Sequence, residues 1–272
     1  MVATPGSSAA TRSVVPRRLA ELAEVPALDG VLFDIDDTVT WEGKLVPEAL
    51  VAMRSLQRAG LRTVPVTGRP AGWVDHIARM WPVDGVVGEN GGLWFWMADG
   101  KLHRRFAQSA EVRRENRRRL DAAAGAILAT VPGTALASDQ PYRELDLAID
   151  FCEDVPALGM DAVDRIARAF TDAGATCKVS SIHVNGWFGD FDKLTGFQRF
   201  HEERWNAPVD FSRWAFFGDS QNDEPMFRAF PFSVGVRNVE RFLDRLVHKP
   251  AWITDASGGD GFVEGVRALV AD

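Results

Sequence analysis

Four aspartates in the sequence occur as two pairs, and each pair follows a short apolar segment. Asp34 and Asp36 follow one of these segments. Asp219 and Asp223 follow another, far along the chain. In a parallel sheet, ligands bind beyond the carboxyl ends of the strands, so we expect the two pairs to converge there. Their charges repel one another, and a hard dication with oxygen ligands, such as Mg²⁺, removes that conflict. The sequence therefore predicts a metal site at these carboxylates.

The first pair also has the spacing that phosphoryl transfer to a carboxylate requires. With a cation present, one carboxylate can attack phosphorus, because the cation shields its charge from the incoming phosphate. A second carboxylate two residues along the strand lies on the same face and can protonate the leaving oxygen, then activate water. Asp34 and Asp36 have this spacing.

Phosphoryl transfer also needs donors for the equatorial phosphate oxygens. Thr67 follows a second apolar segment and offers a hydroxyl and a backbone amide. Lys193 offers a fixed cation at the point where the middle of the chain returns to the pattern of its first part. We expect both residues to lie near the phosphate.

Parallel-sheet elements are predicted in the first and last thirds of the chain. A buried strand within 30–39, an amphipathic helix at 47–59 and a buried strand at 61–66 imply a right-handed crossover. The pattern returns later, with a helix and three strands predicted at 193–203, 214–217, 232–236 and 252–254. These two parts of the chain are expected to form one split α/β domain with a Rossmann-like parallel sheet.

The middle third has an antiparallel pattern. A hairpin is predicted at 93–106, because Asp99-Gly100 supplies the positive backbone angles of a tight turn. Helices are predicted at 109–130 and 160–173, and strands at 142–151 and within 176–188. The strand at 142–151 alternates apolar and acidic residues, which indicates one wet face. We therefore expect a flexible N-terminal extension at 1–24, a core domain at 25–90 and 189–272, and an inserted α+β domain at 91–188.

The segments that carry these residues resemble the four motifs of the haloacid dehalogenase-like (HAD) hydrolases. They are Phe33-Asp34-Ile35-Asp36-Asp37-Thr38, Val66-Thr67-Gly68-Arg69, Lys193 before a helix, and Gly218-Asp219-Ser220-Gln221-Asn222-Asp223. The resemblance runs from about Val31 to the C-terminus. It implies that Asp34 is the nucleophile and Asp36 the acid and base. It further implies phosphate binding by Thr67, Gly68 and Lys193, and a metal held by Asp34, Asp36 through its backbone carbonyl, Asp219 and Asp223.

The position of the insert resembles the type IIB α/β cap found in phosphatases of sugar phosphates. Glu89-Asn90-Gly91-Gly92 at the start of the insert also resembles that subgroup. One departure is Lys193-Leu194-Thr195-Gly196, where such proteins more often have Lys followed directly by Gly. The resemblance implies a Mg²⁺-dependent phosphatase with an aspartyl-phosphate intermediate, acting on a small phosphorylated metabolite, above all a sugar phosphate. The alternatives are a phosphomutase of the same fold and a non-catalytic phosphometabolite-binding protein.

Five further polar residues are candidates for substrate binding, and most have a second interpretation. Arg69 either binds a substrate anion or pairs with a carboxylate at the surface. His183 and Asn185 either face the substrate or occupy exposed strand positions. Asn222 either touches the site or caps the following helix, and Asn90 lies in the resembling segment. The nine tryptophans are expected to serve packing rather than sugar stacking.

Composition narrows the classes of partner. The chain has 272 residues, 46% of them hydrophobic, and a formal net charge of -7, which argues against general nucleic-acid binding. No apolar run approaches the roughly 20 residues that span a bilayer. The two cysteines, Cys152 and Cys177, do not indicate a disulfide framework or a zinc site. We expect a cytoplasmic monomer or homodimer that binds neither nucleic acid nor membranes.

Overall fold

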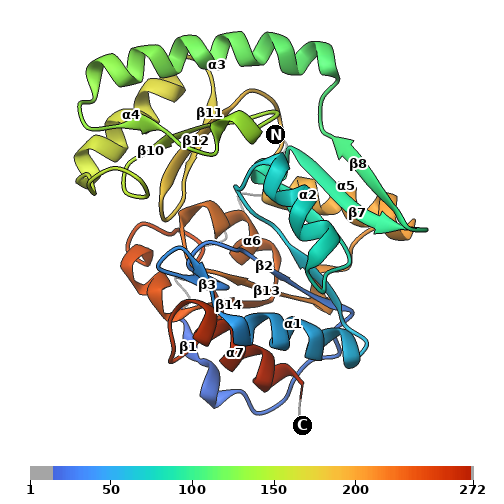
Figure 1. Ribbon diagram of the computed structural model, residues 1–272. Coiled ribbons are helices and arrows are strands. Elements are labelled where there is room, and N and C mark those ends of the chain that lie inside the picture. The colour runs from blue at the N-terminus through green and yellow to red at the C-terminus, as the bar shows by residue number, and fades with distance from the viewer. Residues whose placement is uncertain (1–14, 271–272) are drawn as a thin grey trace, which may run out of the picture.

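A six-stranded parallel sheet forms the centre of the core domain (Figure 1). The computed structural model describes residues 15–270. The sheet order is β1-β15-β14-β13-β2-β5, and every neighbouring pair is parallel. Its strands are β1 (Arg17–Arg18), β2 (Gly30–Phe33), β5 (Arg62–Pro65), β13 (Trp214–Gly218), β14 (Phe232–Gly235) and β15 (Trp252–Ile253). The predicted α/β class is confirmed.

Both faces of this sheet are covered, which explains why its central strands are continuously apolar. Val31 and Phe33 of β2 belong to the hydrophobic cluster on the side of helices α1 (Pro47–Arg58) and α7 (Gly258–Leu269). Leu32 belongs to the opposite cluster, with residues of α5 (Lys193–Trp205) and α6 (Glu224–Ala229). The central strands thereby place their carboxyl ends, and the residues that follow, at fixed positions.

The predicted hairpin forms, but it packs against the core domain. β6 (Val86–Gly88), β7 (Leu93–Ala98) and β8 (Lys101–Phe106) make an antiparallel sheet, and Asp99 and Gly100 have φ values of 50° and 71° at its turn. Alternate residues of β7 enter the two core-domain clusters. Helix α2 (Ala71–Met80) packs on β7 and β6. The sequence placed this hairpin within the insert, because periodicity does not show which body a hairpin packs against.

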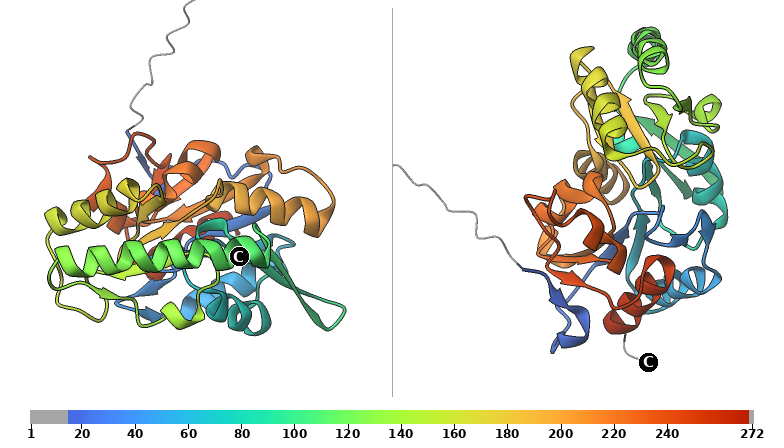
Figure 2. Two further views of the ribbon diagram at one scale, coloured as in Figure 1. Left: turned by 90° about the horizontal axis from the view of Figure 1, so that it is seen from above. Right: turned by 90° about the vertical axis from the view of Figure 1, so that its left-hand side faces the viewer.

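The remaining insert forms a cap with a hydrophobic cluster of its own. Its sheet has the order β11-β12-β10-β9, with antiparallel neighbours. The strands are β9 (Ala135–Leu136), β10 (Leu147–Asp150), β11 (Thr176–Val179) and β12 (His183–Trp187). Helices α3 (Ala110–Thr130) and α4 (Met160–Asp172) lie side by side on its outer face (Figure 2). The cluster of this cap includes Leu120, Ile149 and Phe170 and shares no residue with the two core-domain clusters.

Short elements complete the chain. They are β3 (Thr40–Trp41), β4 (Lys44–Leu45) and the 3₁₀ helices η1 (Leu19–Glu21), η2 (Glu89–Gly91), η3 (Gln140–Tyr142), η4 (Phe211–Arg213), η5 (Gln221–Asp223) and η6 (Arg237–Phe242). None of the helices between residues 15 and 270 has both the length and the apolar character that a membrane crossing requires.

Two details of the sequence interpretation differ from the structure. Residues 1–14 of the predicted extension lie outside the described residues, but Arg17 and Arg18 pair with β15 and Leu19 is buried. The folded part therefore begins before residue 25. The wet face predicted for 142–151 is also wrong, because all four residues of β10 are buried. Asp150 tolerates burial because it accepts backbone hydrogen bonds from Cys152, Glu153 and Asp154 at 2.9, 2.8 and 2.8 Å.

Candidate active site

The loop after β2 holds Asp34 at the carboxyl edge of the core sheet. The backbone N–H of Asp34 donates to the Phe217 carbonyl at 2.9 Å, which extends the pairing with β13 by one residue. The Ile35 carbonyl then accepts three backbone N–H groups, from Thr38, Val39 and Thr40, at 3.0 to 3.2 Å. These bonds turn the chain sharply back and leave the Asp34 side chain at the end of the strand.

Three of the four predicted metal carboxylates converge here. Oxygen atoms of Asp34, Asp219 and Asp223 all lie within 4.8 Å of one another. The Lys193 Nζ lies between two of them, 2.7 Å from Asp34 Oδ1 and 2.6 Å from Asp223 Oδ1. The site therefore combines three buried carboxylates with one buried ammonium.

A capping box fixes Lys193 in place. Asp192 is the N-cap of α5, and its carboxylate accepts from the Thr195 N–H at 2.8 Å. The Thr195 hydroxyl in turn accepts the Asp192 N–H at 2.9 Å. This reciprocal pair satisfies two backbone donors at the start of the helix. It sets the first turn of α5, and with it Lys193, although glycine does not follow the lysine.

The electrostatics of this cluster show a deficit of positive charge. The pKa of Asp34 is raised to about 7, because burial, together with the charges of Asp223 and Asp36, outweighs the lowering by Lys193. Burial and the neighbouring charge of Asp34 also raise the pKa of Asp219 well above its ordinary value. Burial would lower the pKa of Lys193, but Asp223 and Asp34 outweigh that effect and raise it. A dication beside Asp34 and Asp219 would relieve this strain.

The donor set fits such a cation. Asp219 Oδ1 is buried and has no hydrogen-bond partner among the described residues. Asp223 differs, because Oδ2 accepts the N–H groups of Asp219 and Ser220 at 2.9 and 3.2 Å while Oδ1 accepts from Lys193. Among the described residues, the Asp34 carboxylate accepts a side-chain hydrogen bond from Lys193 alone, at Oδ1. Asp34 and Asp219 are therefore the carboxylates of this cluster with a free oxygen atom, and Asp223 shapes the loop behind them.

Asp36 lies apart from the carboxylate cluster. Both of its carboxylate oxygens accept from Arg69 Nε at 3.0 Å, and Oδ1 also accepts from Nη2 at 2.8 Å. Arg69 reaches across to the cap as well, where it contacts Asp139 and Glu153 at 3.3 and 2.7 Å. Arg69 thus pairs with carboxylates at the boundary of the two domains, not at the outer surface.

The backbone amide of Thr67 is not available for the phosphate contact that the sequence predicts. Its backbone N–H is already donated to the Val87 carbonyl at 2.9 Å, so this amide is not free for a phosphate. Its hydroxyl oxygen accepts the Arg69 N–H at 3.0 Å. Gly68 comes closer to the cap, since a Cβ there would lie 3.3 Å from Asn90 Nδ2 and 3.6 Å from Asn185 Oδ1.

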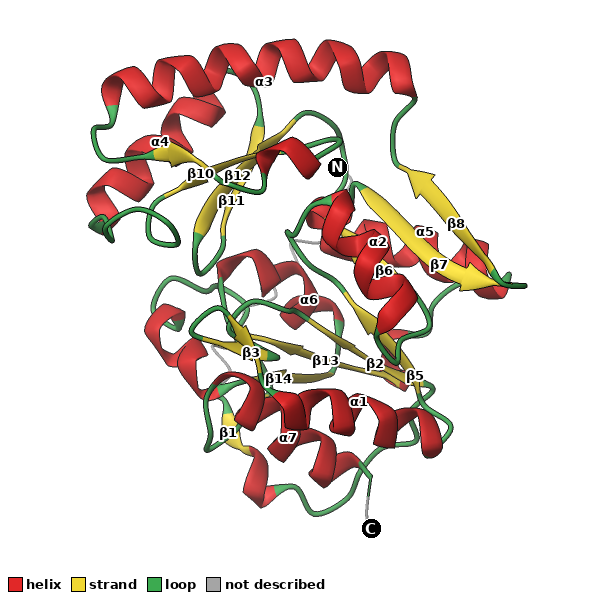
Figure 3. Cartoon of the chain, in the orientation of Figure 1, coloured by secondary structure: helices red, strands yellow, loops and turns green. Residues whose placement is uncertain are grey.

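A small inner cavity lies between Asp34 and the cap. The loop between β11 and β12 reaches down toward the core domain at this point (Figure 3). The free volume is about 10 Å³, room for about one water molecule. The predicted residues that line it are Asp34, Asp36, Gly68, Arg69, His183, Asn185 and Asn222. The predicted residues that lie behind this lining are Thr67, Asn90, Lys193, Asp219 and Asp223.

The cap residues at this cavity are buried. His183 and Asn185 are each 2% exposed, so the alternative of exposed strand positions does not hold. His183 Nε2 lies 2.8 Å from Glu153 Oε2. Burial alone would raise the pKa of Glu153, but the neighbouring side chains of His183 and Arg69 lower it to about 2. Asn222 reaches the cavity and accepts from the Ser220 hydroxyl at 2.9 Å, whereas Asp223 is the N-cap of α6.

One buried acidic residue of the site, Asp146, was not found from the sequence. The buried Asp146 accepts from Arg143 at 2.9 Å, from Asn185 at 3.1 Å and from Asn90 at 3.3 Å, and so joins the domains. Arg143 also donates to the Gly68 carbonyl at 2.8 Å. The acidic alternation around Asp146 is the available signal in the sequence, but that pattern by itself predicts a solvent-facing strand.

Glu89 and Asn238 were missed as well. The buried Glu89 carboxylate accepts the Ala71 N–H at 3.0 Å and three cap N–H groups, those of residues 144–146, at 2.5 to 3.1 Å. Asn238 donates to Asp219 Oδ2 at 3.2 Å and to the Asp37 carbonyl at 2.9 Å. In the sequence, the segment that contains Glu89 is marked by its family resemblance. The segment that contains Asn238 has no feature that indicates a site residue.

No protein-family model matches the chain. A phosphoglycolate phosphatase from Methanoculleus marisnigri is 29% identical over 249 residues, which cover 88% of this chain and 96% of that protein. A phosphatase of the haloalkanoate (HAD) enzyme superfamily from Bacteroides thetaiotaomicron superposes with a TM-score of 0.58 at 21% identity, covering 91% of this chain and 98% of that one. The chain has the HAD fold.

A second solved structure superposes over most of the chain as well. The sucrose-phosphatase of a Synechocystis species, in complex with sucrose and phosphate, has a TM-score of 0.62 at 14% identity and covers 89% of this chain and 98% of its own. The resemblance to the HAD hydrolases, with a parallel-sheet core and an inserted cap, is thereby confirmed at the level of the fold. Within that fold the buried aspartate cluster occupies the carboxyl edge of the sheet.

Proposed function

We propose that this protein is a phosphatase that hydrolyses a small phosphorylated metabolite, above all a sugar phosphate, with Asp34 as nucleophile and Mg²⁺ as cofactor. The observation that carries the proposal is the position of Asp34: at the sheet edge, 2.7 Å from the Lys193 ammonium, in one cavity with Asp36. The phosphatase names of the similar proteins agree with this chemistry.

Asp34 and Asp219 are the side chains that would hold the Mg²⁺, with the Asp36 carbonyl expected beside them. When bound, the cation neutralises the carboxylates and the phosphate oxygens. Lys193 holds the Asp34 carboxylate in position and adds a second positive charge close to the phosphate. Asn238 and Asp223 support the metal side by orienting Asp219 and its loop.

The reaction has two halves, both centred on phosphorus. A carboxylate oxygen of Asp34 forms a bond to phosphorus while the bond to the ester oxygen breaks, and Asp36 gives a proton to the departing alcohol. Asp36 then takes a proton from water, whose oxygen attacks phosphorus as the bond to Asp34 breaks. Inorganic phosphate leaves and Asp34 is a free carboxylate again. The closed cap keeps bulk water from the site during the first half.

The decisive test is the substitution Asp34→Asn. We expect kcat with Mg²⁺ and a panel of phosphate esters to fall at least about a thousandfold, because the amide is a poor nucleophile, while the far-ultraviolet circular dichroism spectrum is unchanged. Asp121→Asn, at an exposed residue on α3, is the matched control and should keep full activity. An Asp34→Asn enzyme with wild-type turnover would refute the assignment.

Two measurements separate the alternatives. Release of inorganic phosphate in proportion to substrate loss is expected of a phosphatase, whereas a phosphomutase would yield an isomeric phosphate ester. Removal of metal with EDTA should abolish turnover, and added Mg²⁺ should restore it. No turnover across the panel would favour a non-catalytic binding protein.

A further inference from the structure

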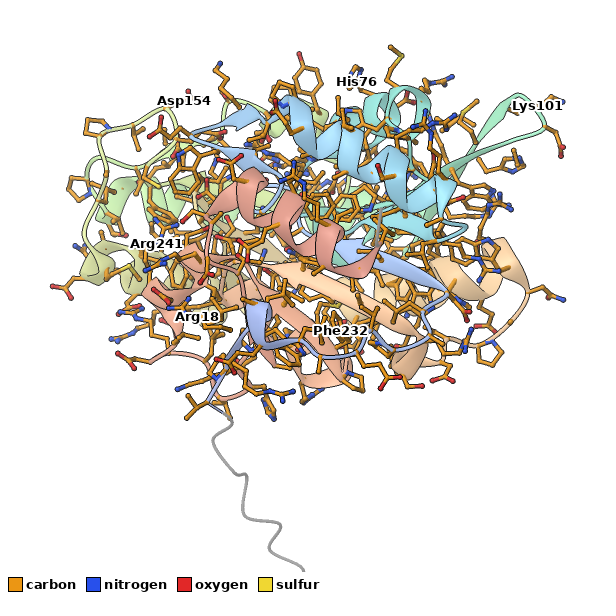
Figure 4. All side chains as sticks on the ribbon, turned by 90° about the horizontal axis from the view of Figure 1, so that it is seen from below. Arg18, His76, Lys101, Asp154, Phe232 and Arg241 are labelled. Carbon is orange, nitrogen blue, oxygen red and sulfur yellow. The ribbon has the colours of Figure 1, made fainter. Side chains whose placement is uncertain are left out.

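An outer cavity opens beside the inner one. Its free volume is about 510 Å³, and it lies between residues 40–43 of the β3–β4 hairpin in the core domain and the cap residues 152–153 and 181–182. Arg241 closes the side toward η6 and lies on the same flank of the molecule as Asp154 of the cap (Figure 4). The two cavities share Asp36, Arg69 and Ile182 in their linings. They are therefore neighbours, separated by these side chains.

The position of Asp36 assigns a direction to the substrate. Asp36 is the proposed acid for the leaving oxygen, so the leaving group must lie within its reach. The inner cavity, with about 10 Å³, has room for about one water molecule and none for a leaving group. The outer cavity lies next to Asp36 and has a volume typical of a small-molecule site. The leaving group therefore extends into the outer cavity.

The charges in the outer cavity disfavour an anionic leaving group. The acidic side chains in its lining are those of Asp36, Asp37, Glu42 and Glu153. The cations are Arg69, which already contacts Asp36, Asp139 and Glu153, and Arg241, which lies 3.8 Å from Asp37. A carboxylate on the substrate would meet repulsion and would have to compete for cations that are already paired.

Uncharged hydroxyl groups suit the same lining. Carboxylates accept hydrogen bonds from hydroxyls, and Ser181 adds a hydroxyl to the same lining. Trp41 adds a large apolar surface, and its side chain is partly exposed at the cavity. One face of its ring packs against Gly258, where an added Cβ would lie 2.6 Å from Trp41 Cε3. Such a ring can pack against the C–H face of a sugar.

We propose that the outer cavity binds the leaving group of the substrate, that Trp41 is its platform, and that it selects an uncharged polyol of at least monosaccharide size over a short carboxylate such as glycolate. This inference rests on the proposed phosphatase function. It differs from the activity that the name of the Methanoculleus marisnigri relative states.

The test is steady-state kinetics with Mg²⁺ on three kinds of substrate. Monosaccharide and disaccharide phosphates probe the outer cavity, 2-phosphoglycolate probes its charge, and acetyl phosphate, whose leaving group is too small to reach Trp41, reports the chemistry alone. We expect at least one sugar phosphate to have a kcat/KM about tenfold or more above that of 2-phosphoglycolate.

Two variants make the test specific to the cavity. Trp41→Ala should raise KM for sugar phosphates about five- to tenfold and change kcat/KM for acetyl phosphate by no more than about twofold. Trp41→Phe, which keeps an aromatic ring, should reverse most of the rise in KM. Glu42→Lys, at an exposed residue, should raise kcat/KM for 2-phosphoglycolate several-fold relative to sugar phosphates. Val51→Ala, at an exposed residue of α1, should change none of these values.

The outcomes separate this inference from the proposed function. Preference for 2-phosphoglycolate over every polyol phosphate, or an equal loss of acetyl phosphate turnover in Trp41→Ala, would overturn the inference while the phosphatase function stands. Absence of all turnover, acetyl phosphate included, would overturn both.

Discussion

Lys193 is the residue on which the charge balance of the site depends. Its ammonium is almost fully buried and contacts two carboxylates, Asp34 and Asp223. Burying a charge is unfavourable unless it is paired. The lysine and the two aspartates therefore stabilise one another, and the third aspartate, Asp219, is the one whose free oxygen faces the expected metal site.

Replacing Lys193 by Met tests this balance, because the substitution removes the ammonium and keeps most of the volume. We expect the free energy of unfolding of the metal-free protein to fall by about 3–5 kcal/mol, since a buried carboxylate is left uncompensated. Urea titration at neutral pH measures it. Lys44→Met, at an exposed lysine, should change stability by less than about 0.5 kcal/mol. Equal stability of Lys193→Met and wild type would show that the ammonium contributes nothing to the fold.

The sequence identifies those site residues for which the residue type and the position in a strand or helix are sufficient to predict that they belong to the site. Asp34, Asp219 and Lys193 follow or begin predicted elements, so their convergence follows from parallel-sheet geometry. Arg143 and Asp146 could not be assigned in the same way. Each is buried because of a partner on another segment, and a single sequence does not show such partners.

At the scale of elements, a close backbone contact links the start of the insert to the helix of Lys193. A Cβ on Gly196 in α5 would lie 2.4 Å from Gly91 Cα. A Cβ on Gly91, which has a φ of 97°, would lie 1.9 Å from the Asp192 carbonyl oxygen. η2 therefore rests directly on the first turn of α5, and this contact aligns Glu89 and Asn90 with the lysine.

Gly196→Ala tests the contact. The added methyl group must push η2 away from α5, so we expect the free energy of unfolding to fall by about 1–3 kcal/mol and kcat to fall with it, as Lys193 shifts. Gly125→Ala in α3 is the matched control, because nothing lies within 4 Å of its Cβ. It should stabilise the protein by about 0.5–1 kcal/mol. Similar effects of the two substitutions in urea titrations would contradict the packing argument.

Elements were predicted well where their local pattern is decisive. The central strands have apolar residues on both faces, and the turn of the hairpin has Asp-Gly. The local pattern does not show which part of the protein each element packs against. The hairpin joins the core domain, and the short edge strand β1 pairs with β15 near the opposite end of the chain. These contacts depend on long-range packing, which periodicity does not encode.

At the scale of the molecule, the two domains meet through polar contacts. Arg69 and Glu89 reach from the core domain to cap carboxylates and amides, and Arg143 reaches back to the Gly68 carbonyl. The hydrophobic clusters of cap and core share no residue. A cap held in this way can open without exposing its own apolar cluster, which suits a cycle of substrate binding and product release.

Burial of carboxylates at this junction makes the stability of the metal-free protein depend on pH. The pKa of Asp34 and of Glu89 is raised by burial to about 7, from 3.8 and 4.5. A group with a raised pKa in the folded state stabilises that state below its unfolded pKa, and the contribution is lost as pH rises through the folded pKa. As pH rises from about 4 to about 7, these two groups therefore lower the free energy of unfolding. The lowered pKa of His201, caused by burial, acts in the opposite direction.

Metal binding should reverse this loss of stability with rising pH, because Mg²⁺ needs ionised ligands and competes with protons for Asp34 and Asp219. In EDTA, we expect the midpoint of thermal unfolding to fall as pH rises from about 5 to about 8. With excess Mg²⁺ the midpoint should rise at every pH, and most at the highest, since folded-state binding adds stability by mass action. Asp219→Asn should remove most of the Mg²⁺ effect and keep the contribution of Glu89. A Mg²⁺ effect that is equal at both ends of the range would show that the metal does not bind at these protonated carboxylates.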